Sequence, residues 1–196
     1  MTRIFDAAHV RRAFSRASTT YTAAAALQRD IEAQLLESLD YLDDRVPGVV
    51  LDVGSGPAHA ALAMRARWPK ARIVALDLAL PMLRQAPVGA GSMLAKLGLQ
   101  PRPVDRVCAD LRALPLADNS VDVLVSNLCL QWVEDLPAVF AGFRRVLKPG
   151  GRIVVCAWTA AAKPSPWQRR HLLEPLCRDG RLAKLEREET YVSWMT

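Results

Sequence analysis

Along most of the chain, short apolar runs alternate with stretches of helical periodicity. Runs rich in Val, Ile and Leu, bounded by polar or Gly-containing segments, predict buried β-strands. They cover residues 49–53, 72–76, 106–109, 121–126 and 152–158. Helical patterns fill the intervals, at residues 58–67, from Pro81 onward and at 133–146. Alternation over short links predicts an α/β fold with a doubly wound, mostly parallel sheet and helices on both faces.

A longer helical pattern, at residues 10–42, precedes the first strand. Phe14, Ala17 and Tyr21 recur on one face, whereas residues 18–20 are Ser and Thr, which are poor in helix interiors and predict a break there. The second helix carries an apolar stripe that should pack on the sheet: Leu27, Ile31, Leu35 and Leu39. We therefore expect leading N-terminal helices ahead of the sheet.

The segments outside these strands and helices are predicted to be connections and a carboxyl-terminal part. Residues 87–105 are rich in Gly and Pro, which predicts an irregular connection with a helical turn near 93–96. A KPGG turn at 148–151 should end the helix that precedes it. We expect one domain over residues 1–196, with leading helices at 1–46, a ligand-binding core at 47–158 and a short carboxyl-terminal part at 159–196, which holds one helix and one further strand at 185–194.

Composition narrows the class of protein. Half of the 196 residues are hydrophobic, enough for a substantial core. No apolar run approaches the ~18 residues that span a bilayer, and the first residues lack the apolar centre of a signal peptide. We expect a cytoplasmic monomer without membrane contact.

The cysteines do not form a metal-binding or disulfide pattern. Cys108, Cys129, Cys156 and Cys177 stand singly, with no C-x-x-C pair. We expect them to be small buried apolar side chains, and we expect no metal site.

The net charge of +6 comes from bases near both ends, including Arg3, Arg11, Arg12 and Arg16. Two interpretations stay open: solvated helical faces, or steering of an acidic partner. Nucleic acid is disfavoured, because no recognised binding motif accompanies the charge.

The candidate chemistry begins at residues 49–60, VVLDVGSGPAHA. Gly54 and Gly56 permit a tight turn and close approach of a ligand to the backbone, at the start of a helix with free N–H groups. Asp77 ends the second strand 21 residues after Gly56, where nucleotide-binding folds place a carboxylate on the ribose. The pair predicts an adenosine-containing ligand; the alternative for Asp77 is a helix cap. A nicotinamide dehydrogenase would need a third Gly where His59 stands.

Four motifs in order resemble the class I S-adenosylmethionine-dependent methyltransferases, which have a Rossmann-like fold. They are D-x-G-x-G, the acid ending the second strand, the run ADLRALPLADNSVDVLVSN and the KPGG turn. The resemblance implies S-adenosylmethionine as co-substrate. Asp52, Gly54 and Gly56 would surround its methionine part, Asp77 with Leu78 its ribose, and Asp110 with Leu111 its adenine. For Asp110 the alternative is a cap at the strand end.

Within that class the chain is most similar to the malonyl-[acyl-carrier protein] O-methyltransferases of biotin synthesis. RRAFSRASTTY, SNLCLQWVED and LPAVFAGFRRVLKPGG carry this likeness. It implies that Tyr21 and Gln28 line the cleft from the leading helices, and Asn127, Gln131 and Trp132 from the loop after the fourth strand. Tyr21, Gln131 and Trp132 would act on the acceptor, a malonyl thioester on acyl carrier protein. An Arg from the amino-terminal cluster would help to orient its carboxylate.

Pro57-Ala58 departs from the family's usual Thr-Gly. A left-handed backbone at Ala58 would cost on the order of 1 kcal/mol. Two further hypotheses stay open: a methyltransferase acting on another small molecule, such as a quinone precursor, and a non-catalytic S-adenosylmethionine-binding protein.

Overall fold

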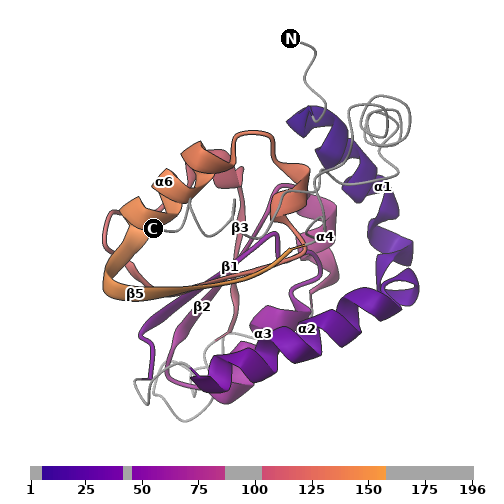
Figure 1. Cartoon of the computed structure of the whole chain (residues 1–196). Helices are drawn as coiled ribbons and strands as arrows, with labels where there is room; N and C mark the ends of the chain where they lie inside the picture. The colour runs from indigo at the N-terminus through magenta and orange to yellow at the C-terminus, as the bar shows by residue number, and fades with distance from the viewer. Residues whose placement is uncertain (1–5, 42–45, 87–102, 158–196) are drawn as a thin grey trace, which may run out of the picture.

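A computed structural model describes residues 6–41, 46–86 and 103–157, and these contain a five-stranded sheet in which every pairing is parallel (Figure 1). The strand order is β3-β2-β1-β4-β5. The bounds are β1 Val49–Val53, β2 Arg72–Asp77, β3 Asp105–Cys108, β4 Val121–Asn127 and β5 Leu147–Cys156. The chain moves outward from β1 through β2 to β3, and then returns to β4 on the other side. The doubly wound α/β fold is confirmed, and the carboxyl ends of β1 and β4 mark the point where the strand order reverses.

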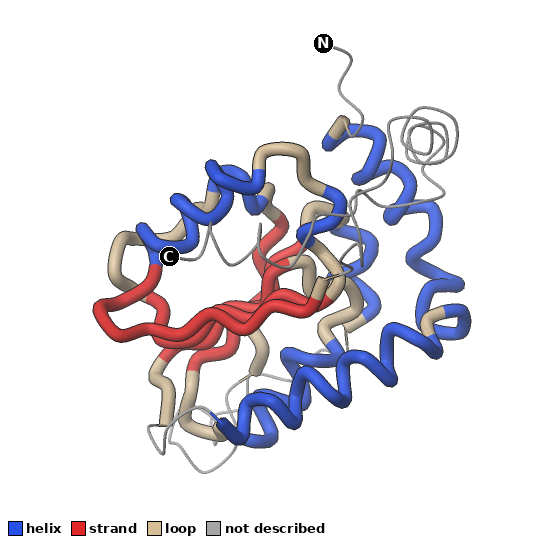
Figure 2. Tube along the Cα trace, viewed as in Figure 1, coloured by secondary structure: helices blue, strands red, loops and turns tan. Residues whose placement is uncertain are grey.

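Helices cover both faces of the sheet, as Figure 2 shows. On one face, α6 (Leu136–Val146) buries Phe140 and Phe143 in a core shared with β1 and β4. On the other, α3 (His59–Arg67) and α4 (Leu80–Gln85) join α2 (Ala26–Ser38) in a second core, which contains Leu35 and Met64. Short 3-10 helices η1, η2 and η3 occupy Leu39–Tyr41, Leu111–Ala113 and Leu130–Trp132. No described helix is long and apolar enough to cross a membrane.

The break between the leading helices lies at Ala25, so its prediction at residues 18–20 was wrong. Helix α1 runs without interruption over Ala7–Ala24. Ser18 and Thr20 fit inside it because their hydroxyls donate to carbonyl oxygens three residues earlier, at 3.0 and 3.2 Å. The apolar stripe of α2 is also shorter than predicted: Leu35 is buried, whereas Leu27 is 54% exposed.

Two other boundaries differ from the predictions. Asp135 caps α6, so that helix begins at Leu136, after the η3 turn. The KPGG segment belongs to β5, where the register shifts opposite Asp122. Residues 93–96 and 159–196, for which a helical turn, a helix and a strand were predicted, lie outside the described ranges.

Asp122 joins the amino ends of β1, β4 and β5. Its carboxylate accepts hydrogen bonds from the backbone N–H groups of Gly48 and Val49, at 3.0 and 2.8 Å, and from Lys148 Nζ. Burial opposes ionisation of Asp122, but these donors outweigh it and lower the pKa of the carboxyl group.

The cysteine prediction is only partly right. Cys129 packs beneath the Gly54 turn with a buried thiol, and that burial raises its pKa. Cys156 is half-buried, whereas Cys108 is exposed, so the prediction of burial was wrong for it. All three are free thiols, and Cys177 lies outside the described ranges.

The turn after β1 is bound to the end of β2. The N–H groups of Gly54 and Ser55 both donate to the Leu76 carbonyl oxygen, at 2.8 and 3.1 Å. Gly54, Gly56 and Ala58 all have positive φ, at 71°, 53° and 61°. A Cβ on Gly54 would lie 2.3 Å from Cys129 Sγ, whereas a Cβ on Gly56 would meet nothing within 4 Å. Gly54 is therefore required by packing as well as by conformation.

This difference predicts unequal losses of stability. Gly56→Ala should lower the free energy of unfolding by about 1–2 kcal/mol, the cost of a left-handed backbone. Gly54→Ala adds the clash with Cys129 and should cost about 3 kcal/mol or more. Denaturant titrations would measure both, and Cys129→Gly should restore part of the stability lost in Gly54→Ala. Equal losses in the two single variants would contradict the steric role of Cys129.

Candidate active site

A cavity of about 810 Å³ opens at the carboxyl ends of the central strands. One wall comes from the sheet side: the Gly54–Gly56 turn, the residues that end β2, β3 and β4, and the η3 loop. The opposite wall is one face of α1, which contributes Ala7, Val10, Arg11, Phe14 and Tyr21. Ligands of doubly wound folds bind at this edge of the sheet.

The predicted site residues come together in this cavity, with one exception. Those that line it are Tyr21, Gln28, Gly54, Gly56, Asp77, Leu78, Asp110, Leu111, Asn127, Gln131 and Trp132. Asp52 does not line it: this side chain is only 2% exposed and lies in the core of the sheet.

Asp77 is fixed by two backbone groups. One carboxylate oxygen accepts from Gly56 N at 2.9 Å and the other from Ala79 N at 2.7 Å. Each oxygen still has a further lone pair for a ligand hydroxyl. Burial raises the pKa of Asp77, although both hydrogen bonds act against that rise. The predicted alternative for Asp77, a solvated cap of the helix at Pro81, is wrong, because α4 has Ala79 as its N-cap residue and no side-chain cap hydrogen bond, and Asp77 instead lies on the cavity wall.

Asp110 combines two roles. It caps η2 by accepting from the backbone N–H of Arg112 at 2.9 Å, and it pairs through both oxygens with the Arg112 guanidinium. The side-chain hydrogen bond from Arg112 is the main reason why the pKa of Asp110 is lowered. The cap predicted as an alternative is confirmed, and recognition of an adenine by Asp110 stays a prediction.

Buried polar atoms without partners surround the same region. Among the described residues, these include Asn127 Oδ1 and Gln131 Oε1 on the cavity wall, and Ser126 Oγ and Asp52 Oδ2 behind it. A buried polar group without a hydrogen bond costs free energy, so such groups are the ones that a polar ligand stabilises.

Asp52 lies beneath the turn, and its burial opposes ionisation of its carboxyl group. Its carboxyl group accepts from the backbone N–H of Ala61, and burial, followed by the charges of Glu32 and Asp77, raises its pKa from 3.8 to about 8. Glu32, on α2, also has a pKa raised by burial. Three carboxyl groups that resist ionisation therefore lie at this end of the cavity.

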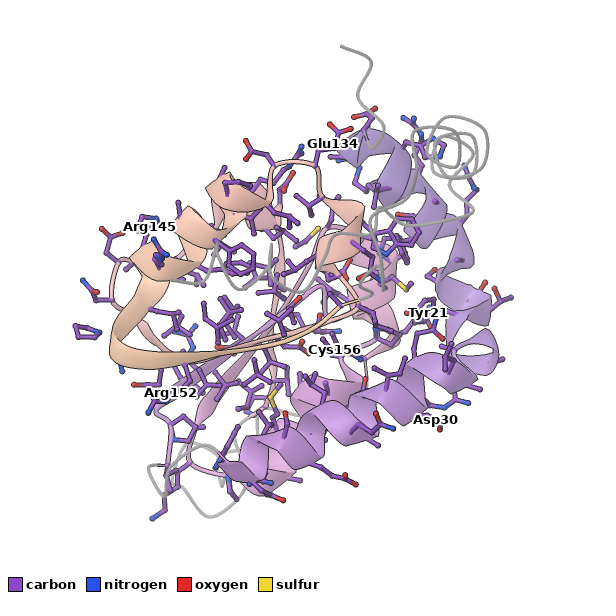
Figure 3. The ribbon with its side chains drawn as sticks, in the orientation of Figure 1. Tyr21, Asp30, Glu134, Arg145, Arg152 and Cys156 are labelled. Atoms are coloured by element: carbon purple, nitrogen blue, oxygen red, sulfur yellow. The ribbon has the colours of Figure 1, made fainter. Side chains whose placement is uncertain are left out.

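An aromatic cluster connects α1 to the η3 loop. Phe14 makes edge-to-face contacts with Tyr21 and Trp132, with ring centroids 6.3 and 5.7 Å apart. Tyr21 lies between the carboxyl-terminal end of α1 and the sheet (Figure 3). Burial and then the charges of Asp77 and Glu32 raise the pKa of Tyr21, so its hydroxyl stays protonated and able to donate.

Several lining residues were not predicted as site residues. They include Val10, Arg11 and Phe14 on α1, Cys129 before η3, and Arg112 after Asp110. Helical spacing could have found the first group, since Phe14 was already placed on the face of Tyr21, and Val10 and Arg11 lie one turn before Phe14. No group of three or more potential metal ligands occurs in the described part of the chain.

The burial of Asp52 predicts a pH-dependent effect of Asp52→Asn. The pKa is raised on folding, so the wild type loses stability as pH rises from about 4 to about 8. Asn keeps an acceptor for Ala61 without this ionisation. The difference in unfolding free energy, variant minus wild type, should therefore increase by roughly 1 kcal/mol per pH unit between pH 5 and 8. Denaturant titrations at several pH values would measure it; a constant difference would contradict the assignment.

Comparison with known proteins gives matches in sequence and in structure. The family model described as a methyltransferase domain matches residues 51–155. A malonyl-[acyl-carrier protein] O-methyltransferase of Xylella fastidiosa is 53% identical over 157 residues, which cover 80% of this chain and 50% of that protein. The protein of the same name from Pseudescherichia vulneris is 36% identical over 183 residues, which cover 93% and 66%. For most of these relatives, the chain spans about half of their length.

Solved structures share the fold. The YcgJ protein of Bacillus subtilis superposes with a TM-score of 0.63 at 21% identity, over 85% of this chain and 66% of that one. A geranyl diphosphate C-methyltransferase of Streptomyces coelicolor has a TM-score of 0.64 at 20% identity, over 88% and 61%.

The matched residues include the carboxyl-terminal part of β1, and they include the glycine turn, Asp77, Asp110 and the end of β4, which lie on the sheet side of the cavity. The match extends over more than half of the chain, and it includes the strand–turn–helix unit with which the family resemblance began. This chain belongs to the methyltransferase domain family.

Proposed function

We propose that this chain binds S-adenosylmethionine and transfers its methyl group to the free carboxylate of a malonyl thioester on acyl carrier protein. The observation that carries the proposal is the convergence of the predicted ligand residues on one cavity at the carboxyl ends of β1, β2 and β4. The choice of acceptor is supported by the names of the relatives. One of them, the Xylella fastidiosa protein, matches 80% of this chain.

The donor groups of the cavity suit this co-substrate. Asp77 holds fixed oxygens to which two ribose hydroxyls can donate, and Leu78 and Leu111 offer apolar contact to a flat ring. The unpartnered oxygens of Asn127 and Gln131 can accept from N–H or O–H groups of a ligand. Gly56 leaves open space at the turn, where a side chain would approach a ligand. We propose Gln28 and Asp52 as further contributors, Gln28 from the cavity wall and Asp52 from behind it, beneath the Gly54–Gly56 turn.

The proposed methyl transfer depends on alignment of the carboxylate with the methyl group more than on acid–base catalysis. When bound, the sulfonium of the co-substrate supplies an electrophilic methyl group. A malonyl carboxylate is ionised near pH 7 and is itself a nucleophile, so no general base is required. Tyr21, protonated and half-buried, would donate a hydrogen bond that orients this carboxylate. Gln131 and Trp132 would hold the acceptor, and the Phe14–Trp132 contact would limit the entry of water.

Calorimetric titration with S-adenosylmethionine and S-adenosylhomocysteine tests the first half of the proposal, and transfer of a labelled methyl group to malonyl-acyl carrier protein tests the second. We expect binding in the micromolar range and formation of a methyl ester. Transfer to a quinone precursor instead would favour the alternative acceptor, and binding without transfer to any acceptor would favour a non-catalytic protein.

The ribose assignment predicts that Asp77→Ala weakens binding of S-adenosylhomocysteine by at least about tenfold, because hydrogen bonds to a charged group are lost. The control is Asp122→Ala, which also removes a carboxylate that accepts two backbone N–H groups next to β1, but at the opposite end. Both variants should lose stability, and Asp77→Ala alone should lose affinity. Equal affinity of Asp77→Ala and the wild type would refute the assignment.

The role of Tyr21 predicts a separation of turnover from binding. Tyr21→Phe keeps the contact with Phe14 and removes the hydroxyl, so kcat should fall by about tenfold while the affinity for S-adenosylhomocysteine changes little. Steady-state kinetics and calorimetry on the same preparation would measure both. An unchanged kcat would leave Tyr21 a packing residue.

A further inference from the structure

We infer that Arg11 binds the phosphate group of the pantetheine arm that carries the acceptor. The inference rests on the proposed function, because it requires an acceptor bound as a thioester to such an arm. Arg11 is the first residue of the RRAFSRASTTY run, but the sequence did not single it out as a site residue, and it lies outside the family match at residues 51–155. Its basis is the position and the charge of one side chain on the cavity wall.

Arg11 and Arg112 are the cations among the described residues that line the cavity. Arg112 is neutralised by its two-oxygen pairing with Asp110. Arg11 is exposed and forms no ion pair within the described ranges. Of the acids near this end of α1, Asp6 and Asp135 accept hydrogen bonds from backbone N–H groups of their own helices, and the charge of Glu134 acts on the Arg112 guanidinium. The Arg11 guanidinium is therefore available to an anionic ligand.

Arg11 lies on the same wall as Tyr21 but at the other end of it. The two residues are separated by ten positions of α1, and at 1.5 Å per residue this places them about 15 Å apart along the helix axis. Phe14 stands between them and contacts both Tyr21 and Trp132. In Figure 3, Glu134, another lining residue, lies beside the amino-terminal end of α1, whereas Tyr21 lies near the carboxyl-terminal end.

This separation matches the length of a malonyl-pantetheine phosphate. About sixteen bonds join the malonyl carboxylate to the phosphorus, and an extended chain advances about 3.4 Å for every three bonds, which gives roughly 18 Å. With the carboxylate at Tyr21, the arm would pass over Phe14 and Trp132 along α1 and bring its phosphate to Arg11. The co-substrate would occupy the opposite side, against Asp77 and Asp110. A guanidinium binds a phosphate through two parallel N–H···O bonds.

The test compares Arg11→Gln with the wild type on acceptors that differ in the phosphate. Binding of malonyl-acyl carrier protein, malonyl-coenzyme A and malonyl-pantetheine, which lacks the phosphate, is measured by calorimetry. The kcat/KM for methyl transfer is measured in parallel. Arg11→Gln should weaken binding of both phosphate-bearing acceptors by about tenfold or more and leave malonyl-pantetheine unchanged. Arg11→Lys should recover part of the loss, since it keeps the charge.

Arg12→Gln is the matched control. Arg12 is the next residue of the same helix, is exposed, carries the same charge and does not line the cavity. It should bind all three acceptors like the wild type. Equal losses in Arg11→Gln and Arg12→Gln, or an equal loss by Arg11→Gln on malonyl-pantetheine, would overturn the inference.

The two phosphate-bearing acceptors separate the sources of the anion. A loss confined to malonyl-coenzyme A would mean that Arg11 contacts its nucleotide, and a loss confined to the carrier protein would mean that Arg11 contacts the protein surface. Either result overturns the inference. Wild-type protein that binds these acceptors but methylates none of them would refute the proposed function, while the binding comparison would still decide the role of Arg11.

Discussion

The fold and the site depend on one set of hydrogen bonds, which connects the turn after β1 to the end of β2. Leu76 accepts from Gly54 and Ser55, and Asp77 accepts from Gly56 and Ala79. The central strand cannot change its exit direction without breaking these bonds. The same bonds hold the Asp77 carboxylate at the cavity wall, so the proposed ribose-binding group is positioned by the backbone of the turn itself. A chain that keeps its sheet thereby keeps this part of its site.

On the cavity wall and directly behind it lie polar groups whose burial is unfavourable without a ligand. Burial raises the pKa values of Asp52, Asp77 and Glu32, so negative charge there is costly. A bound cation would favour the ionised carboxylates, and ligand hydrogen bonds would satisfy Asn127 and Gln131. A ligand with a positively charged centre and several hydrogen-bonding groups relieves both costs. S-adenosylmethionine has a positively charged sulfonium and several hydrogen-bonding groups. The electrostatics of the site therefore favour the same co-substrate as the family match.

The sequence was most informative where local rules and the tertiary structure agree. The apolar run at residues 49–53 gave the bounds of β1, because a central parallel strand is buried on both faces. Asp77 was found by its spacing from Gly56, which follows from the length of one β–α–β unit. The helix break was misplaced because Ser18 and Thr20 bond to their own helix, which composition does not reveal. Arg11 was left undistinguished among the amino-terminal bases, because choosing it requires knowing which face of α1 meets the sheet.

The departure at Pro57-Ala58 affects stability more than the shape of the cavity. Ala58 does adopt the left-handed backbone, with φ 61°, so the expected cost of about 1 kcal/mol applies. Its methyl group, however, is fully buried in the core formed with α2 and α3, and burial of one methyl group offsets about 0.8 kcal/mol. Pro57 removes no N–H group that Asp77 uses, because the donors are Gly56 and Ala79. Neither residue lines the cavity, so the substitution leaves the proposed co-substrate contacts in place.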